Sequence, residues 1–142
     1  MYYSMWSAYL HDPTKIDFDV PVIIWLQGGP GASSQFGAFT ELGPISIKEG
    51  KAKNNPWGWN LMGHTVFIDQ PLGVGFSHIR DTTKPHITSA RIAAEHLLNF
   101  LDNFYKTWPA LKYSPLYLTG ESFAGHYLPA FGSRIVNNQT FL

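Results

Sequence analysis

The sequence has no cysteine and no excess of charge of either sign. Without cysteine the chain can form neither disulfides nor thiolate metal sites, and its redox compartment stays undecided. Ten Lys and Arg balance ten Asp and Glu, so the formal net charge is zero. A domain that binds nucleic acid needs a surplus of Lys and Arg on one face, so we expect no nucleic acid among its partners.

Long apolar runs are absent as well. The longest run, Val20–Leu26 with Pro21 inside it, is far shorter than the roughly 20 residues that a membrane span needs. No basic stretch followed by an apolar one opens the chain, so we expect neither a membrane span nor a secretory signal in it. The histidines show no metal-ligand spacing, and we expect neither a metal nor a cofactor.

What is present indicates a folded domain. The 142 residues correspond to one domain. Hydrophobic residues make up 44% of the chain and include 10 Phe, 7 Tyr and 5 Trp. Disordered chains have few aromatic residues and a high net charge, so this composition favours a globular protein.

Strands and helices are predicted to alternate along the chain. Residues 88–105 form the clearest helix, because Ala93, Leu97, Phe100, Leu101 and Phe104 fall on one helical face, with Thr88 or Ser89 as N-cap and Trp108-Pro109 at the end. A second helix is expected over residues 123–136. Apolar runs bounded by Gly and Pro predict strands at residues 22–26, 45–47, 65–68 and 116–119. This order predicts an α/β fold, with a mostly parallel sheet and helices on both faces.

Ser122 lies directly after one predicted strand and directly before a helix. This setting is typical of a nucleophile elbow, a sharp bend that exposes a serine hydroxyl. The bend needs little bulk two residues before and after the serine, where Gly120 and Ala124 stand. The N–H of Phe123 and the positive end of the following helix would favour an oxyanion. The alternative interpretation is an ordinary serine at a helix N-cap.

A glycine-rich loop, Gly28-Gly29-Pro30-Gly31, follows the apolar strand at residues 22–26. In an α/β-hydrolase a loop after an earlier strand supplies a second N–H to the oxyanion hole. Glycine lets the backbone approach a reacting carbonyl with no Cβ in the way. The alternatives are a plain loop or a phosphate cradle. The cradle is disfavoured because neither a P-loop lysine nor a GxGxxG motif is present.

Together these motifs resemble the serine carboxypeptidase family, within the α/β-hydrolase fold. The resemblance spans nearly the whole chain and rests on residues 25–34, 41–44, 55–60, 68–77 and 119–129, in the family's order. Gln27 stands where the family usually has Asn, which resembles the branch that includes the vitellogenic-type carboxypeptidases. Ala32 replaces the family's usual Cys, or the Gly of that branch.

The resemblance implies a role for each motif. Ser122 would be the nucleophile, and the N–H groups of Gly29 and Phe123 would form the oxyanion hole. The terminal carboxylate of a peptide substrate would bind to a group made of Trp25, Gln27, Gly28, Glu41 and Glu121. An ionised glutamate can only accept hydrogen bonds, so the two glutamates must share a proton with the substrate, which implies a preference for acidic pH. The alternatives are a solvated helix residue for Glu41 and a core aromatic for Trp25.

The acid–base half of the machinery is not apparent in the sequence. In this fold the base and its carboxylate follow the nucleophile in the order Ser, Asp, His. The 20 residues after Ser122 contain no Asp or Glu and one histidine, His126, which lies one helical turn on and is interpreted as a packed helix residue. We therefore expect one partial α/β-hydrolase domain, residues 1–142, truncated after the elbow helix. Its strand at 116–119 would be an edge that a missing C-terminal segment or a partner covers.

These observations lead to one main functional hypothesis and two alternatives. The main hypothesis is a fragment of a serine-type carboxypeptidase that cleaves C-terminal peptide bonds through an acyl-enzyme on Ser122. The alternatives are a catalytically inactive truncated homologue that acts as a binding module, and an acyltransferase of the same family. The resemblance implies a lysosomal, vacuolar or secreted protein, and Asn138-Gln139-Thr140 matches the pattern of a glycosylation acceptor.

Overall fold

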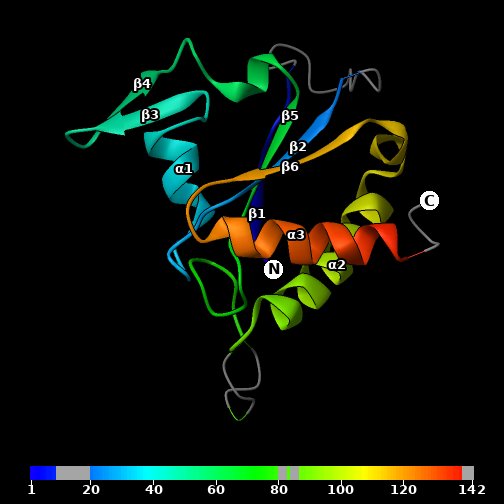
Figure 1. Ribbon diagram of the computed structural model, residues 1–142. Helices are drawn as coiled ribbons and strands as arrows, with labels where there is room; N and C mark the ends of the chain where they lie inside the picture. Colours follow the sequence, from blue (N-terminus) through cyan, green and yellow to red (C-terminus); the bar gives the residue numbers. More distant parts are fainter. Residues whose placement is uncertain (9–19, 80–82, 84–86, 139–142) are drawn as a thin grey trace.

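A four-stranded sheet with helices on both faces forms the centre of the protein (Figure 1). The computed structural model describes residues 1–8, 20–79, 83 and 87–138. The strand order is β1 (Tyr3–Trp6), β5 (His64–Ile68), β2 (Val22–Leu26) and β6 (Leu116–Gly120). Strands β5, β2 and β6 are parallel, whereas β1 is antiparallel to β5. The predicted mostly parallel sheet, covered on both sides, is confirmed.

The two central strands are buried along their whole length. Their side chains alternate between two apolar clusters. Val22, Ile24 and Leu26 of β2 face a cluster shared with the two long helices, whereas Trp25 packs with Phe67 of β5 on the opposite face. Because both of its faces are covered, β2 is apolar at every position. Strand β5 is apolar over residues 66–68 and begins with two buried polar residues, His64 and Thr65.

Helices α2 (Ala90–Thr107) and α3 (Ala124–Val136) cover one face of the sheet and pack against each other. Ser89 is the N-cap of α2, because its hydroxyl oxygen accepts a hydrogen bond from the Ile92 N–H at 3.3 Å. The helix ends at Trp108, as expected. All five residues predicted to form the inner face of α2 are buried, so the assignment of that helix from its period is confirmed.

The other face carries one strand that was predicted, at residues 45–47, and two elements that the sequence pattern did not predict. Helix α1 (Ser34–Thr40) has only seven residues, too few for an apolar period to stand out. Strand β3 (Ile45–Lys48) pairs with β4 (Lys51–Asn54) in a separate hairpin. Strand β4 is exposed throughout and lacks apolar alternation. It forms because Glu49 and Gly50, with φ of +53° and +71°, make a tight two-residue turn.

Short 3₁₀ turns at η1 (Trp59–Leu61) and η2 (Pro109–Tyr113) lead into strands β5 and β6. Within the described part of the chain, β6 pairs only with β2, so one of its edges is open. Unpaired strand edges expose backbone N–H and C=O groups that recruit other strands. The strand that leads to Ser122 is therefore also the strand that offers a pairing edge.

We expect the isolated 142-residue chain to self-associate or to be poorly soluble because of this edge. Tyr117, 58% exposed on β6, should contribute, and Tyr117→Lys should lower the associated fraction because a charged edge residue opposes strand pairing. Sedimentation velocity measures this fraction. Tyr113→Lys is the matched control, since Tyr113 is 86% exposed but lies outside the strand. A monodisperse monomer of the unmodified chain that unfolds cooperatively would contradict the expectation.

Candidate active site

Ser122 occupies a sharp bend between β6 and α3. Its φ is +54°, in the left-handed region that side-chain-bearing residues rarely adopt. A Cβ placed on Gly120 would lie 2.4 Å from the Leu26 carbonyl oxygen and 2.7 Å from the Cβ of Ala124. The residues two before and two after the serine thus approach each other too closely for any bulk. The structure has the geometry of a nucleophile elbow, not that of a smooth helix start, and Ser122 is exposed on it.

The glycine-rich loop lies against this bend. A Cβ on Gly28 would be 2.8 Å from both the Glu121 carbonyl oxygen and the Phe123 backbone nitrogen. Phe123 directly precedes α3, so its N–H has no acceptor inside the helix. Gly29 has φ of +108° and is exposed beside it. The two segments predicted to supply oxyanion donors, far apart in sequence, are in contact.

A second group of predicted residues meets around the Gln27 side-chain amide. Gln27 is buried at the end of β2, where its Oε1 accepts a hydrogen bond from Trp25 Nε1 at 2.8 Å and its Nε2 donates to Glu121 Oε1 at 2.7 Å. The Trp25 contact fixes which way the amide points. Trp25 is thus both a core aromatic, 6% exposed, and a hydrogen-bond donor to this cluster.

Glu41, at the C-cap of α1, completes the cluster. Burial raises the pKa of its carboxyl group, and repulsion from Glu121 raises it further, whereas a hydrogen bond with Gln27 lowers it. Like-charge neighbours favour retention of a proton by one of them. The cluster is therefore able to hold a proton on Glu41 at a pH where an ordinary surface glutamate is ionised.

Two residues of this site were not predicted. A Cβ on Gly37 would lie 2.5 Å from Trp25 Nε1, 2.8 Å from Gln27 Oε1 and 3.1 Å from Glu41 Oε2, so glycine there makes room for the cluster. Ser34 is fully buried, and its hydroxyl oxygen accepts a hydrogen bond from the Gln27 N–H at 3.0 Å. The sequence offered one indication of the role of Gly37, namely a glycine inside the short segment 34–40.

The described histidines lie in varied surroundings. His64 is fully buried, with Nδ1 3.2 Å from the Ser7 hydroxyl, and His78 is exposed. His126 is exposed on α3, where its ring contacts that of Phe123 at a centroid distance of 4.7 Å. His11 and His86 lie outside the described residues. The described residues include no group of three or more potential metal ligands, and none of their helices has the length and apolarity to cross a membrane.

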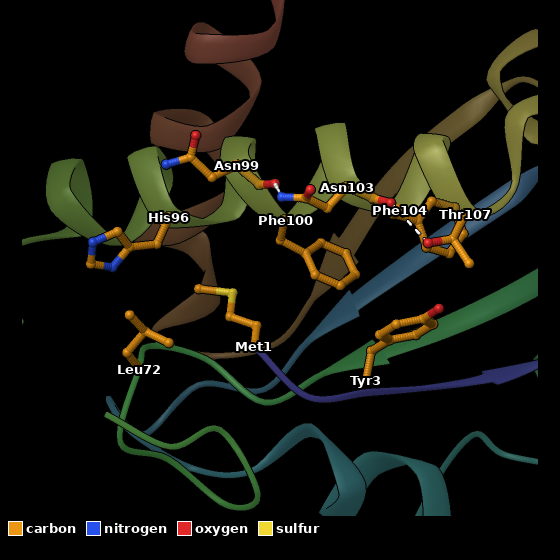
Figure 2. A pocket seen from close by; sticks show the side chains of 9 residues that line it. All are labelled: Met1, Tyr3, Leu72, His96, Asn99, Phe100, Asn103, Phe104 and Thr107. Carbon is orange, nitrogen blue, oxygen red and sulfur yellow. Dashed lines mark hydrogen bonds between the residues drawn. The ribbon is translucent and has the colours of Figure 1, made fainter. Parts of the chain in front are cut away.

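A cavity of about 500 Å³ lies apart from the residues predicted to form the site, between α2 and β1 (Figure 2). Its lining combines aromatic and aliphatic side chains with His96 and polar groups along α2, namely Met1, Tyr3, Leu72, His96, Asn99, Phe100, Asn103, Phe104 and Thr107. Hydrogen bonds to the α2 backbone already engage Asn103 and Thr107. None of the predicted site residues lines this cavity.

Asn138, the first residue of the predicted glycosylation triplet, follows the C-terminal end of α3. It is half-buried. The other two residues of the triplet, Gln139 and Thr140, lie outside the described part of the chain, so the structure leaves the glycosylation hypothesis as a prediction.

Comparisons with known proteins agree with this geometry. The family described as Serine carboxypeptidase matches residues 1–141. Vitellogenic carboxypeptidase of Aedes aegypti is 41% identical over 121 residues, which cover 84% of this chain and 26% of that protein. Serine carboxypeptidase-like 50 of Arabidopsis thaliana is 40% identical over 141 residues, which cover 98% of this chain and 31% of that protein.

Among solved structures, the prohormone-processing carboxypeptidase Kex1Δp of Saccharomyces cerevisiae superposes with a TM-score of 0.83 at 35% identity. The match covers 98% of this chain and 30% of that structure. The chain thus spans about a quarter to a third of the length of these relatives.

Proposed function

Because the chain belongs to the serine carboxypeptidase family, we propose that it is the nucleophile-bearing part of an enzyme that removes C-terminal residues from peptides. The observation that carries the proposal is the contact between the Ser122 bend and the Gly28 backbone. That contact supports the proposal, because acyl transfer requires a hydroxyl close to backbone N–H donors such as those assigned to Gly29 and Phe123.

In the proposed reaction the Ser122 hydroxyl attacks the carbonyl carbon of the last peptide bond. A base takes the hydroxyl proton and passes it to the leaving amine, so that the C–N bond breaks and an ester to Ser122 remains. Water then hydrolyses this ester. The N–H groups of Gly29 and Phe123 would stabilise the oxyanion of both tetrahedral intermediates, a type of contact worth about 3 to 4 kcal/mol per donor.

The cluster around Gln27 would hold the substrate's terminal carboxylate. The Gly28 N–H and the Gln27 amide are donors, and Trp25 keeps the amide in its orientation. Glu41 could donate only while protonated, and the raised pKa of its carboxyl group supports this assignment. The five residues would thereby distinguish a free C-terminus from an internal peptide segment.

This assignment predicts that substrate binding weakens as the pH rises. Below the raised pKa of Glu41 its carboxyl group is protonated and donates to the substrate. Above it, the carboxylate repels the substrate, so KM should rise by up to about tenfold per pH unit. The measurement is hydrolysis of a blocked dipeptide between pH 5 and 8 by a hybrid enzyme, in which residues 1–142 replace the matching segment of a longer relative.

Glu41→Gln should make KM less dependent on pH in this assay, because the amide donates at any pH. A substrate with an amidated C-terminus is the control, since it has no terminal carboxylate to repel. A peptidase rate that rose steadily from pH 5 to 8 would contradict the assignment.

We further propose that the base and its orienting carboxylate come from outside these 142 residues, on a C-terminal segment or a partner that pairs with the open edge of β6. Two features support this. No Asp or Glu follows Ser122 in the sequence, and the exposed His126 ring contacts Phe123. The same features favour the second candidate, an inactive homologue that binds peptide C-termini. Hydrolysis by the hybrid enzyme, compared with peptide binding by the chain alone, distinguishes them.

For location, we propose a lysosomal, vacuolar or secreted protein. The support is the family membership and the preference for acidic pH that the Glu41–Glu121 pair implies. In such a compartment Asn138 would be a candidate site of glycosylation. The location of tagged protein in cells tests the proposed compartment. A loss of apparent mass when secreted protein is treated with glycosidase tests glycosylation.

A further inference from the structure

A buried carboxylate, that of Asp69, links the glycine-rich loop to a second loop at the same end of the sheet. Asp69 follows β5 and is fully buried. Its Oδ1 accepts a hydrogen bond from the Ser33 hydroxyl at 2.6 Å, and its Oδ2 accepts one from the Phe76 N–H at 2.9 Å.

The second loop, residues 70–77, is shaped around this carboxylate. Gly75 has φ of +54°, and a Cβ there would lie 2.2 Å from Asp69 Oδ2 and 3.0 Å from the Ser33 hydroxyl oxygen. The Asp69 carbonyl oxygen accepts a further hydrogen bond from the Ser77 hydroxyl at 2.6 Å. The Asp69 N–H donates to the Tyr2 carbonyl oxygen at 3.1 Å, so the backbone of Asp69 is itself held in place.

Ser33 is the point at which this carboxylate reaches the oxyanion loop. Its hydroxyl donates to Asp69 and accepts from the Gln35 N–H at 3.1 Å as the N-cap of α1. One residue earlier, the Ala32 N–H donates to the Gly28 carbonyl oxygen at 3.1 Å and closes the Gly28–Ala32 turn. Ser33 thus anchors the chain directly after this turn, which contains the Gly29 N–H.

The loop is also held at its start and middle. The Gln27 N–H donates to the Ser34 hydroxyl oxygen at 3.0 Å. A hydrogen bond joins the Gly31 backbone to the buried Tyr127 hydroxyl of α3. Among the described residues, the Ser33–Asp69 bond ties the C-terminal end of the loop to the residue that follows β5, the strand on the far side of β2 from β6. The start of α1 is anchored separately, because Gln35 Nε2 donates to the Phe67 carbonyl oxygen of β5 at 3.3 Å.

We propose that Asp69 is a positioning residue for the oxyanion hole, which acts through Ser33 to fix the Gly29 N–H opposite Ser122. This rests on the proposed function of Ser122. An oxyanion donor is effective only when it is held at the position where charge develops, and loss of one donor costs about 10²–10³ in kcat. A loosened donor should lose part of that factor, with little change in the affinity for substrate.

The first test is amide hydrogen exchange at Ala32, whose N–H closes the turn, in the hybrid enzyme. Ser33→Ala and Asp69→Asn should speed exchange there by about tenfold or more, whereas Ser33→Thr, which keeps the hydroxyl, should restore protection. Asp102→Asn is the matched control, because Asp102 pairs with Lys106 on exposed α2. Unchanged protection in Ser33→Ala would overturn the proposal. If amides throughout the core of Asp69→Asn also exchange faster, that variant is destabilised as a whole, and the result for Ser33→Ala decides whether the link to the loop exists.

The second test is catalytic and uses the hybrid enzyme. Ser33→Ala should lower kcat by about 10- to 100-fold with KM nearly unchanged, and Ser33→Thr should recover most of it. A rise in KM at constant kcat, or no kinetic change, would overturn the positioning role. If the unmodified hybrid is inactive although exchange responds to Ser33→Ala, then the proposed function fails and the structural link between Asp69 and the loop stands.

Discussion

Ser122→Ala should lower kcat of the hybrid enzyme by about four to six orders of magnitude, the usual effect of removing a serine nucleophile. The reason is chemical: the acyl-enzyme cannot form without the hydroxyl, and only binding and the oxyanion donors remain. Turnover of a blocked dipeptide measures the loss. Labelling with a fluorophosphonate, followed by mass spectrometry, locates the reactive residue.

Two controls accompany this experiment. Ser133→Ala, further along the same helix α3, removes an identical hydroxyl and should leave both turnover and labelling intact. The isolated 142-residue chain should not be labelled, because no base activates Ser122 there. Labelling of the Ser122→Ala hybrid, or its full activity, would refute the assignment of the nucleophile. Rapid labelling of the isolated chain would show that a base is present within it.

Gly120→Ala should destabilise the hybrid enzyme by about 2 to 4 kcal/mol. The added Cβ would lie 2.4 Å from the Leu26 carbonyl oxygen and 2.7 Å from the Ala124 Cβ. The Leu26 carbonyl oxygen belongs to the backbone of a central strand, and the Ala124 Cβ is fixed to the bend. Moving either atom would therefore cost free energy. Urea unfolding measures the loss, and the same substitution should impair turnover by displacing Ser122.

Gly125→Ala is the matched control for Gly120→Ala. It lies five residues away in the first turn of α3, and a Cβ there would meet nothing within 4 Å. Alanine favours a helix over glycine by up to about 1 kcal/mol, so this variant should be as stable as the parent or more so. Equal destabilisation by the two variants would mean that the bend is not the cramped element described above.

Much of the fold could be predicted because its central elements have strong periodic patterns. Strand β2 is an unbroken apolar run, β5 is apolar over residues 66–68, and α2 shows its inner face at helical spacing. Helix α1 and strand β4 could not be predicted. The first is one short segment with a glycine in it, and the second is a polar strand that depends on its turn and on pairing with β3.

The candidate site divides in the same way. The bend at Ser122 and the glycine-rich loop have local signatures, so the sequence indicated both, and the structure brings them into contact. The space that Gly37 leaves for the Gln27 amide, and the link from Asp69 to Ser33, depend on how distant segments approach one another. Contacts between distant segments leave no periodic pattern within either segment, so these features become visible only in the three-dimensional structure.

Under the proposed function, the open edge of β6 would make this chain one half of a two-part catalyst. Ser122 follows the edge strand of the described sheet, so a segment that completed the sheet would extend the surface on which Ser122 lies. If the completing half is supplied as a separate polypeptide, docking and the arrival of the base would be a single event. The rate of peptide turnover would then measure the amount of assembled enzyme, as in a complementation assay.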